Sequence, residues 1–208
     1  MKEVIFDVCW TMYKSNTTFD FIRFIYRING IHSFKLNFLN SKIGKMILLL
    51  IGKLIGRDIY RELFISLLKG YQRTDLEIFS KKFYHNFLLE KKIDYTFEIF
   101  NEIESDKILL CSASLDIVVE KIASELKVKF FASELEYENG VCTGKISKDL
   151  LGMKDALFEN KVIDLVVTDN LSDLGLVIKS LNSVILSTSK NVSFWERNGF
   201  SVDYILQD

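Results

Sequence analysis

Short apolar runs alternate with helix-like segments through the second half of the chain, and this alternation limits the folds open to it. Runs typical of strands and segments with helical spacing follow one another at 107–113, 115–126, 127–132, 153–160, 162–168, 172–180, 183–187, 190–198 and 202–206. A further apolar run at 4–8 is too short for a helix and indicates a buried strand. Strands that alternate with helices form a parallel sheet with helices on both faces. We therefore expect an α/β fold with a Rossmann-like parallel sheet core.

The region between the first two strands is predicted to be a helical insertion. Helical spacing begins at Asn16, where Asn16 and Thr17 are both candidate helix caps, and the first helix should end at Gly30. Further helical stretches follow at 33–40, 42–55, 58–70 and, after a capping Thr74, 75–89. Later in the chain, Asn139–Gly140 between two alternating segments predicts a hairpin. We expect a split core made of 1–14 and 92–208, which holds an all-helical insertion at 15–91.

Composition argues against several classes of function. The 208 residues suffice for one domain with a modest insertion. Lys and Arg number 27 against 28 Asp and Glu, so no overall positive field would attract a nucleic acid. The three cysteines lie far apart, with no CxxC pair and only two histidines in the chain, which argues against a disulfide framework or a zinc site. The first residues do not resemble a secretory signal, so we expect a cytoplasmic protein, and nothing in the sequence indicates its oligomeric state.

Polar residues occur where the predicted strands end, and one lysine begins the helix before the strand at 162–168. These residues are Asp7, Ser112, Ala113, Lys154, Asp169 and Asp173. In an open α/β sheet, ligands bind beyond the carboxyl ends of the strands. Carboxylates there can bind a hard cation, and a lysine with a hydroxyl group can hold a phosphate.

The order of these residues resembles that of the haloacid dehalogenase superfamily, within its phosphoserine-phosphatase-like branch. The segment Asp7-Val8-Cys9-Trp10-Thr11 resembles the first motif, Asp-X-Asp-X-Thr, and Ser112 stands in the place of the second. Lys154 matches the third motif, and the pair Asp169 and Asp173 matches the fourth. The branch also carries a helical cap where this chain has its insertion. The resemblance covers nearly the whole chain.

The resemblance implies a role for each of these residues in phosphoryl transfer to a covalent aspartate. Asp7 would attack phosphorus, and Thr11 would orient it. Mg²⁺ would be held by Asp7, the Cys9 carbonyl and Asp169, with Asp173 in support. The phosphate of a small phosphorylated substrate would be bound by the Lys154 ammonium, the Ser112 hydroxyl and nearby amides such as that of Ala113.

The same residues also have purely structural interpretations. Asp7 could form a turn, Ser112 could cap the following helix, and Asp173 could cap the helix after the strand at 162–168. Lys154 could be a solvated surface lysine.

Cys9 departs from the pattern, because phosphatases of this family carry an aspartate there that exchanges protons with the leaving group and with water. A thiol with an ordinary pKa of about 8.5 is a poor general base, and loss of acid–base catalysis costs on the order of 10²–10⁴-fold. Trp10 likewise replaces a frequent glycine. Hydrolysis of a small or lipid-linked phosphate ester, transfer of the phosphoryl group to another acceptor, and phosphate binding without turnover all stay open.

The most apolar stretch of the chain, 46–56, lies inside the helical insertion and is flanked by Lys42, Lys45 and Lys53. It is too short to span a bilayer. One hypothesis is a helix packed in a small core of the insertion. The other is peripheral contact of 42–56 with a membrane or lipid surface, since lysines beside apolar residues are typical of interfacial helices.

Overall fold

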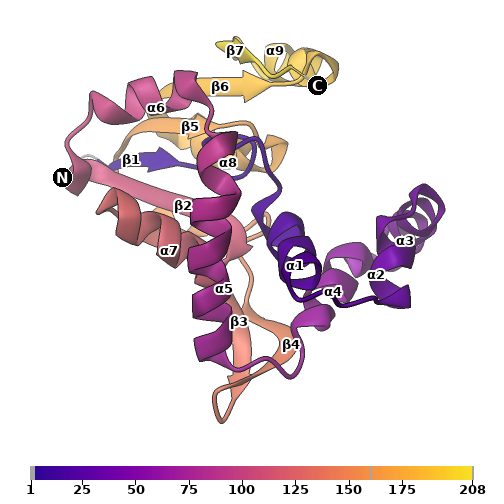
Figure 1. Cartoon of the computed structure of the whole chain (residues 1–208). Coiled ribbons are helices and arrows are strands. Elements are labelled where there is room, and N and C mark those ends of the chain that lie inside the picture. The colour runs from indigo at the N-terminus through magenta and orange to yellow at the C-terminus, as the bar shows by residue number, and fades with distance from the viewer. Residues whose placement is uncertain (1–2, 160, 208) are drawn as a thin grey trace.

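A seven-stranded sheet forms the centre of the molecule (Figure 1). The computed structural model describes residues 3–159 and 161–207. In the order of the sheet the strands are β4 (Val141–Lys148), β3 (Lys129–Glu138), β2 (Ile108–Leu115), β1 (Glu3–Phe6), β5 (Ile163–Thr168), β6 (Ser180–Ser187) and β7 (Tyr204–Ile205). All neighbouring strands pair in parallel except β3 and β4, which form the antiparallel hairpin at Asn139–Gly140. The predicted parallel α/β sheet and its hairpin are confirmed.

The central position of β1 places Asp7 at the carboxyl edge of the sheet. Val4 lies beside Ile108 of β2 on one side and Leu165 of β5 on the other. The backbone N–H of Asp7 still donates to the carbonyl of Val167, at 3.0 Å, although β1 itself ends at Phe6. Because the chain connections run in opposite directions on the two sides of β1, a crevice forms at its carboxyl end, where ligands bind in such sheets.

Helices fill the insertion as predicted, with breaks where capping residues occur (Figure 1). They are α1 (Thr17–Ile28), α2 (Phe34–Asn40), α3 (Lys42–Ile55), α4 (Ile59–Ile65) and α5 (Arg73–Asn86). The side chains of Asn16, Ser33, Ser41 and Asp58 each accept a hydrogen bond from a backbone N–H in the first turn of the helix that follows. Such caps satisfy donors that the helix itself leaves free.

Two predicted helices of the insertion differ from the observed ones. The stretch at 58–70 is divided into α4 and a short 3₁₀ helix, Ser66–Leu68. Thr74 is not the cap of α5, because the helix starts at Arg73 and its N-cap is Gln72. The N–H of Arg73 donates to the carbonyl of Gly140 in the β3–β4 hairpin, at 2.9 Å, so a contact distant in sequence fixes where α5 begins.

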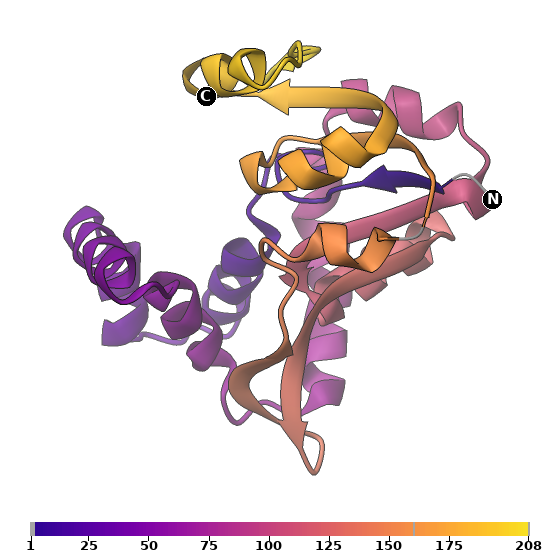
Figure 2. The same cartoon turned by 180° about the vertical axis from the view of Figure 1, so that it is seen from behind.

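In the described part of the chain, four further α-helices lie outside the insertion and flank the sheet (Figure 2). They are α6 (Asp94–Asn101), which the sequence analysis did not predict, α7 (Asp116–Leu126), α8 (Leu174–Lys179) and α9 (Val192–Arg197). The helix predicted at 153–160 is a 3₁₀ helix, Lys154–Phe158. A 3₁₀ helix covers about 2.0 Å per residue against 1.5 Å in an α-helix, which suits a short connection that must reach β5.

Successive side chains of each strand pack alternately into two hydrophobic clusters, one on each face of the sheet. Val4 and Phe6 belong to the larger cluster, and Ile5 belongs to the smaller one, as the two-residue period of a strand requires. The larger cluster continues without a break into α1, α4 and α5. The insertion therefore shares its core with the sheet. None of the described helices is long and apolar enough to cross a membrane.

Candidate active site

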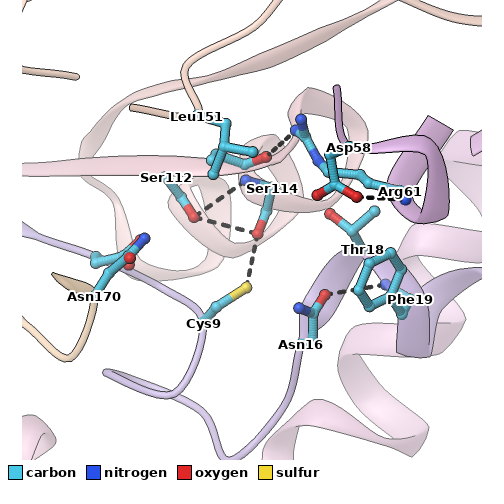
Figure 3. A pocket seen from close by; sticks show the side chains of 12 residues that line it. Cys9, Asn16, Thr18, Phe19, Asp58, Arg61, Ser112, Ser114, Leu151 and Asn170 are labelled. Atoms are coloured by element: carbon cyan, nitrogen blue, oxygen red, sulfur yellow. Dashed lines mark hydrogen bonds between the residues drawn. The ribbon is translucent and has the colours of Figure 1, made fainter. Parts of the chain in front are cut away.

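A cavity of about 160 Å³ lies at the carboxyl edge of the sheet, between the sheet and the insertion (Figure 3). It is lined by Asp7, Cys9, Asn16, Thr18, Phe19, Asp58, Arg61, Ser112, Ala113, Ser114, Leu151 and Asn170. Half of the predicted site residues thus line one cavity. The other half connect to Asp7 or to each other through polar contacts described below.

A buried lysine joins two of the carboxylates predicted from the sequence. The Lys154 ammonium lies 3.1 Å from Oδ1 of Asp7 and 2.8 Å from Oδ2 of Asp173, and the three side chains are at most 4% exposed. Thr168 also donates to Asp173 Oδ2, at 2.8 Å. Burial disfavours the charged lysine, but the charges of Asp7 and Asp173 outweigh it and raise the pKa of Lys154. Lys154 is therefore a buried cation held beside Asp7, and its interpretation as a solvated lysine is wrong.

Thr11 contacts Asp169, whereas we expected it to orient Asp7. Its hydroxyl donates to Oδ1 of Asp169, at 3.0 Å, and accepts from the backbone N–H of Asp169, at 2.9 Å. The backbone carbonyl of Thr11 is held in turn by the hydroxyl of Thr96 in α6, at 2.6 Å. These bonds fix the position of Asp169 relative to the loop that follows β1. The unpredicted helix α6 thus supports the site through Thr96.

The charges around Asp169 are suited to a cation. Burial and the nearby charge of Asp7 raise the pKa of Asp169 to about 8. A divalent ion between the two carboxylates would remove this repulsion. The described residues contain no group of three or more His, Cys, Asp or Glu side chains arranged to hold a metal ion. Mg²⁺ needs no such group, because one or two carboxylates commonly bind it together with water and substrate phosphate, so Asp7, Asp169 and the Cys9 carbonyl fit it, with Asp173 acting through Lys154.

Three polar groups surround the thiol of Cys9, and Figure 3 shows its contact with Ser114. Its Sγ lies 2.9 Å from Ser114 Oγ and 3.1 Å from Thr17 Oγ1, and it accepts from the Thr17 backbone N–H at 3.3 Å. Burial, together with the charge of Asp7, raises the pKa of Cys9. The thiol is therefore protonated at neutral pH. Thr17 and Ser114 were missed by the sequence analysis, and their only signal is proximity to the motifs, since Ser114 lies two residues beyond Ser112.

Ser112 points into the site and does not cap a helix. Helix α7 begins at Asp116 with Leu115 as its N-cap, and no side chain caps it. The hydroxyl of Ser112 donates to Ser114 Oγ at 3.2 Å, which joins it to the hydroxyl groups around Cys9. The hydroxyl is thus placed at the cavity wall, where a phosphate oxygen can reach it.

Arg61 of α4 connects the insertion to the sheet beside the cavity. Its guanidinium is mostly buried and donates to the carbonyl of Ala113 at 2.7 Å and to Asp149 at 2.5 Å. Asp149 also accepts from Ser133 of β3, at 2.9 Å. No motif marks Arg61 in the sequence, because its role depends on where α4 lies against β2 and β3.

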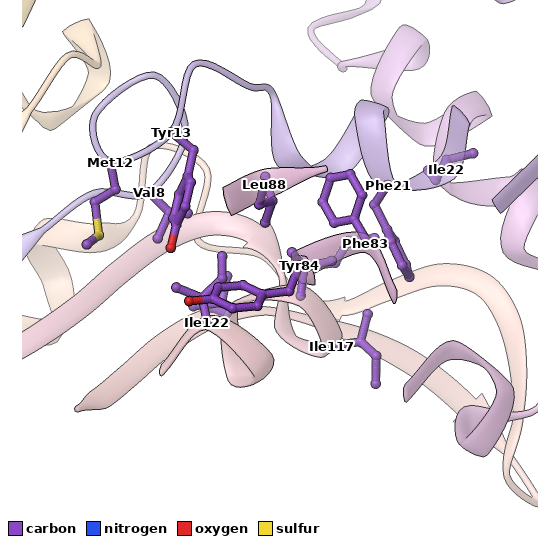
Figure 4. Close-up of a cluster of buried hydrophobic side chains, with 14 of the residues drawn as sticks. Val8, Met12, Tyr13, Phe21, Ile22, Phe83, Tyr84, Leu88, Ile117 and Ile122 are labelled. Carbon is purple, nitrogen blue, oxygen red and sulfur yellow. The ribbon is translucent and has the colours of Figure 1, made fainter. Parts of the chain in front are cut away.

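The loop after β1 turns sharply at Trp10. This residue has φ of +52°, in the left-handed region that bulky side chains rarely adopt. The N–H groups of Met12 and Tyr13 both donate to the Val8 carbonyl, which closes the turn. A glycine would adopt this backbone conformation without strain. Val8, Met12 and Tyr13 belong to the larger hydrophobic cluster, and Figure 4 shows Val8 and Tyr13 directed toward its other members, which anchors the loop.

Comparison with known protein families identifies one family that matches most of this chain. The profile of the haloacid dehalogenase-like hydrolases matches residues 4–175. At the sequence level no curated protein matches.

Solved structures resemble this one over nearly the whole chain. A Bordetella pertussis Tohama I protein of unknown function has 14% identity and a TM-score of 0.67, over 97% of each chain. A phosphoserine phosphatase in its apo form has 18% identity and a TM-score of 0.59, over 100% of this chain and 94% of the other. A cytosolic 5'-nucleotidase IIIB bound to cytidine has 16% identity and a TM-score of 0.55, over 100% and 81%. At these identities the likeness establishes the fold.

Proposed function

The chain belongs to the haloacid dehalogenase-like hydrolase family, and from this premise we propose that it is a Mg²⁺-dependent phosphatase of small or lipid-linked phosphate monoesters. The observation that carries the proposal is the Asp7 carboxylate, which lies in the cavity with the Lys154 ammonium 3.1 Å away. A carboxylate with a fixed cation beside it can attack phosphorus, because the cation offsets the negative charge of the incoming phosphate.

The proposed reaction has two displacements. In the first, Asp7 forms a bond to phosphorus and the substrate alcohol leaves with the electrons of the broken P–O bond. In the second, water attacks the aspartyl-phosphate and releases inorganic phosphate and the free carboxylate. Lys154, the Ser112 hydroxyl and the Ala113 amide bind phosphate oxygens in both steps. A bound Mg²⁺ would supply further positive charge at the phosphate.

The helical segment 15–91 acts as the cap in this proposal, and 1–14 with 92–208 form the catalytic core. Phe19, Asp58 and Arg61 of the insertion line the same cavity as Asp7. These three side chains would contact the part of the substrate beyond its phosphate.

Proton transfer limits the rate in this proposal. A protonated Cys9 with a raised pKa neither gives up a proton readily to the leaving group nor removes one from water. The substrate or solvent must supply the proton of the first step, and the second step should be slow. This observation also favours a second function, in which an acceptor other than water takes the phosphoryl group from Asp7.

Turnover of an aryl phosphate with Mg²⁺ tests the proposal, because an aryl leaving group needs little protonation. We expect weak activity in the wild type, its loss in Asp7→Asn, and an increase of at least tenfold in Cys9→Asp. Ser114 and Thr17 supply three donors for the new carboxylate. Cys9→Ser is the matched control, since a hydroxyl keeps these contacts but adds no acid or base, and its activity should stay at the wild-type level.

Three outcomes discriminate among the functions. Wild-type activity in Asp7→Asn would show that Asp7 is not the nucleophile. Absence of turnover in both the wild type and Cys9→Asp, over a broad set of phosphate esters, would indicate a binding protein without catalysis. Formation of a phosphorylated alcohol in place of inorganic phosphate, on addition of alcohols, would indicate phosphoryl transfer.

A further inference from the structure

The insertion contains a strongly basic segment in a chain whose net charge is −1. Residues 21–57 include no Asp or Glu. Seven Lys and Arg side chains belong to this segment, namely Arg23, Arg27, Lys35, Lys42, Lys45, Lys53 and Arg57. The segment comprises most of α1, all of α2 and α3, and the turn before α4. Positive charge is therefore concentrated on one part of the cap.

Helix α3 contacts the rest of the protein along a narrow stripe. Its buried residues are Gly44, Leu48 and Gly52, one helical turn apart. A Cβ added at Gly44 would lie 2.1 Å from the Phe38 carbonyl oxygen, and one at Gly52 would lie 2.5 Å from the Arg57 carbonyl oxygen. The two glycines thus allow the backbone of α3 to approach its neighbours closely. The stripe occupies only one side of the helix, so the other sides face outward.

The outward sides of α3 divide into a basic sector and an apolar sector. At about 3.6 residues per turn, Lys42, Lys45 and Lys53 fall on one side, next to Leu49. The neighbouring sector is apolar and exposed, with exposed fractions from 40% to 85%, and consists of Ile43, Met46, Ile47, Leu50, Ile51 and Leu54. In α2, Phe34 is 89% exposed. The hypothesis that this stretch packs in a small core of its own is wrong.

The position of α3 in the molecule leaves this surface accessible. Figures 1 and 2 show α2 and α3 at the end of the insertion far from the sheet, from opposite directions. An exposed apolar patch with charges at its border is typical of an interaction site.

We propose that α2 and α3 dock on an anionic lipid bilayer, with the apolar sector of α3 inserted at the headgroup boundary and its lysines against the lipid phosphates. Amphipathic helices with lysines beside the apolar face bind membranes in this way. Each basic residue near an anionic surface contributes to the attraction. Charge complementarity disfavours a second copy of this chain, since a two-fold contact would bring the same lysines together. Helix α3 has 14 residues, about 21 Å in length, so it lies on the bilayer and does not span it.

Docking and catalysis are separate properties of the molecule, although α3 leads directly to the cavity. Asp58, which lies shortly after the end of α3, is the N-cap of α4. It also lines the cavity that contains Asp7. Vesicle binding can thus be measured without substrate, and failure of one proposal does not affect the other.

Co-sedimentation of the full chain with vesicles tests the docking proposal. Vesicles of phosphatidylglycerol and phosphatidylcholine should pellet the protein at low salt, and pure phosphatidylcholine vesicles should pellet much less. Salt should release it, because it screens the lysines. The triple variant Lys42→Glu/Lys45→Glu/Lys53→Glu should bind on the order of a hundredfold more weakly.

Two further variants separate charge, apolar insertion and general effects. The matched control Lys129→Glu/Lys145→Glu/Lys190→Glu changes the net charge equally at exposed lysines outside the insertion, and it should bind as the wild type does. Leu50→Ser/Leu54→Ser removes exposed apolar groups without disturbing the core and should weaken binding about tenfold or more.

Several results would overturn the proposal. One is equal binding by the two lysine variants, which would show a non-specific charge effect. Another is absence of wild-type pelleting at low salt. A third is a dimer in light scattering that Leu50→Ser/Leu54→Ser converts to monomer while the wild type ignores vesicles, which would assign the surface to a second copy of the chain.

Discussion

Replacement of Lys154 by methionine tests the charge balance at the centre of the site. The ammonium of Lys154 lies 3.1 Å from Asp7 and 2.8 Å from Asp173, and all three side chains are nearly inaccessible to solvent. At an effective dielectric constant of about 20, each pair attracts by roughly 5–6 kcal/mol, and much of this is offset by the cost of burying the charges. Methionine fills a similar volume but leaves two carboxylates without their cation. Removal of one partner from a buried pair costs about 3–5 kcal/mol.

Urea unfolding of Lys154→Met, in EDTA, measures this cost. At pH 7 the free energy of unfolding should fall by about 3–5 kcal/mol, a large part of the total for a domain of this size. The raised pKa of Lys154 means that its contribution is complete below the unfolded value of about 10.4 and is lost only at higher pH. The deficit of the variant should shrink toward pH 5, since burial raises the pKa of Asp173 and its protonation removes unpaired charge.

The double variant Lys154→Met/Asp173→Asn is the control for this reasoning. Removal of one carboxylate together with the lysine should restore more than 1 kcal/mol of stability. Aryl phosphatase activity should be absent in both variants, because both lack the cation beside Asp7. A loss below about 1 kcal/mol in Lys154→Met, or no recovery in the double variant, would refute the account of Lys154 as the cation that stabilises this cluster.

Three further predictions follow from burial, charge and packing. Asp169→Asn should raise the stability of the cation-free protein at pH 8 by about 1–3 kcal/mol in urea unfolding, because a carboxyl with a pKa raised to about 8 destabilises the fold as pH rises toward that value. Calorimetry should show that the variant no longer binds Mg²⁺, and that the affinity of the wild type for Mg²⁺ increases from pH 6 to 8. A variant no more stable than the wild type would contradict this reasoning. Cys111 and Cys142, whose pKa values burial raises (to about 12 for Cys111), should resist iodoacetamide at pH 8 until the protein is unfolded, as mass spectrometry would show, and rapid native labelling of either would disprove their burial. Gly44→Ala should lower the melting temperature, with a loss of about 1–3 kcal/mol, because its new Cβ would meet the Phe38 carbonyl oxygen, and an unchanged melting temperature would show that α2 and α3 can separate at little cost.

Local signals in the sequence were sufficient for most elements of the fold. The hairpin at Asn139–Gly140 depends on two adjacent residues that accept positive φ, and both have it, at +50° and +80°. The start of α1 depends on Asn16, which is the one of the two candidate caps that accepts a hydrogen bond in the first turn. The predicted start of α5 was wrong, because the observed start depends on a hydrogen bond from Arg73 to Gly140, which joins segments far apart in the chain. Boundaries set by such contacts leave no local pattern to read.

The position of the candidate site could be predicted from the sequence because strand ends are local features and parallel strands bring their carboxyl ends to one edge. Asp7 follows β1, Ser112 lies in β2 and Asp169 follows β5, as the apolar runs indicated. The sequence alone also determined that position 9 is a cysteine and that 21–57 contains no acid. Tertiary structure decided what these residues do. It placed Thr11 on Asp169, surrounded the Cys9 thiol with Thr17 and Ser114, and left α3 exposed on all but one narrow stripe. The physical reason is that pKa values, hydrogen-bond partners and exposure depend on neighbours brought together only by the packing of distant segments.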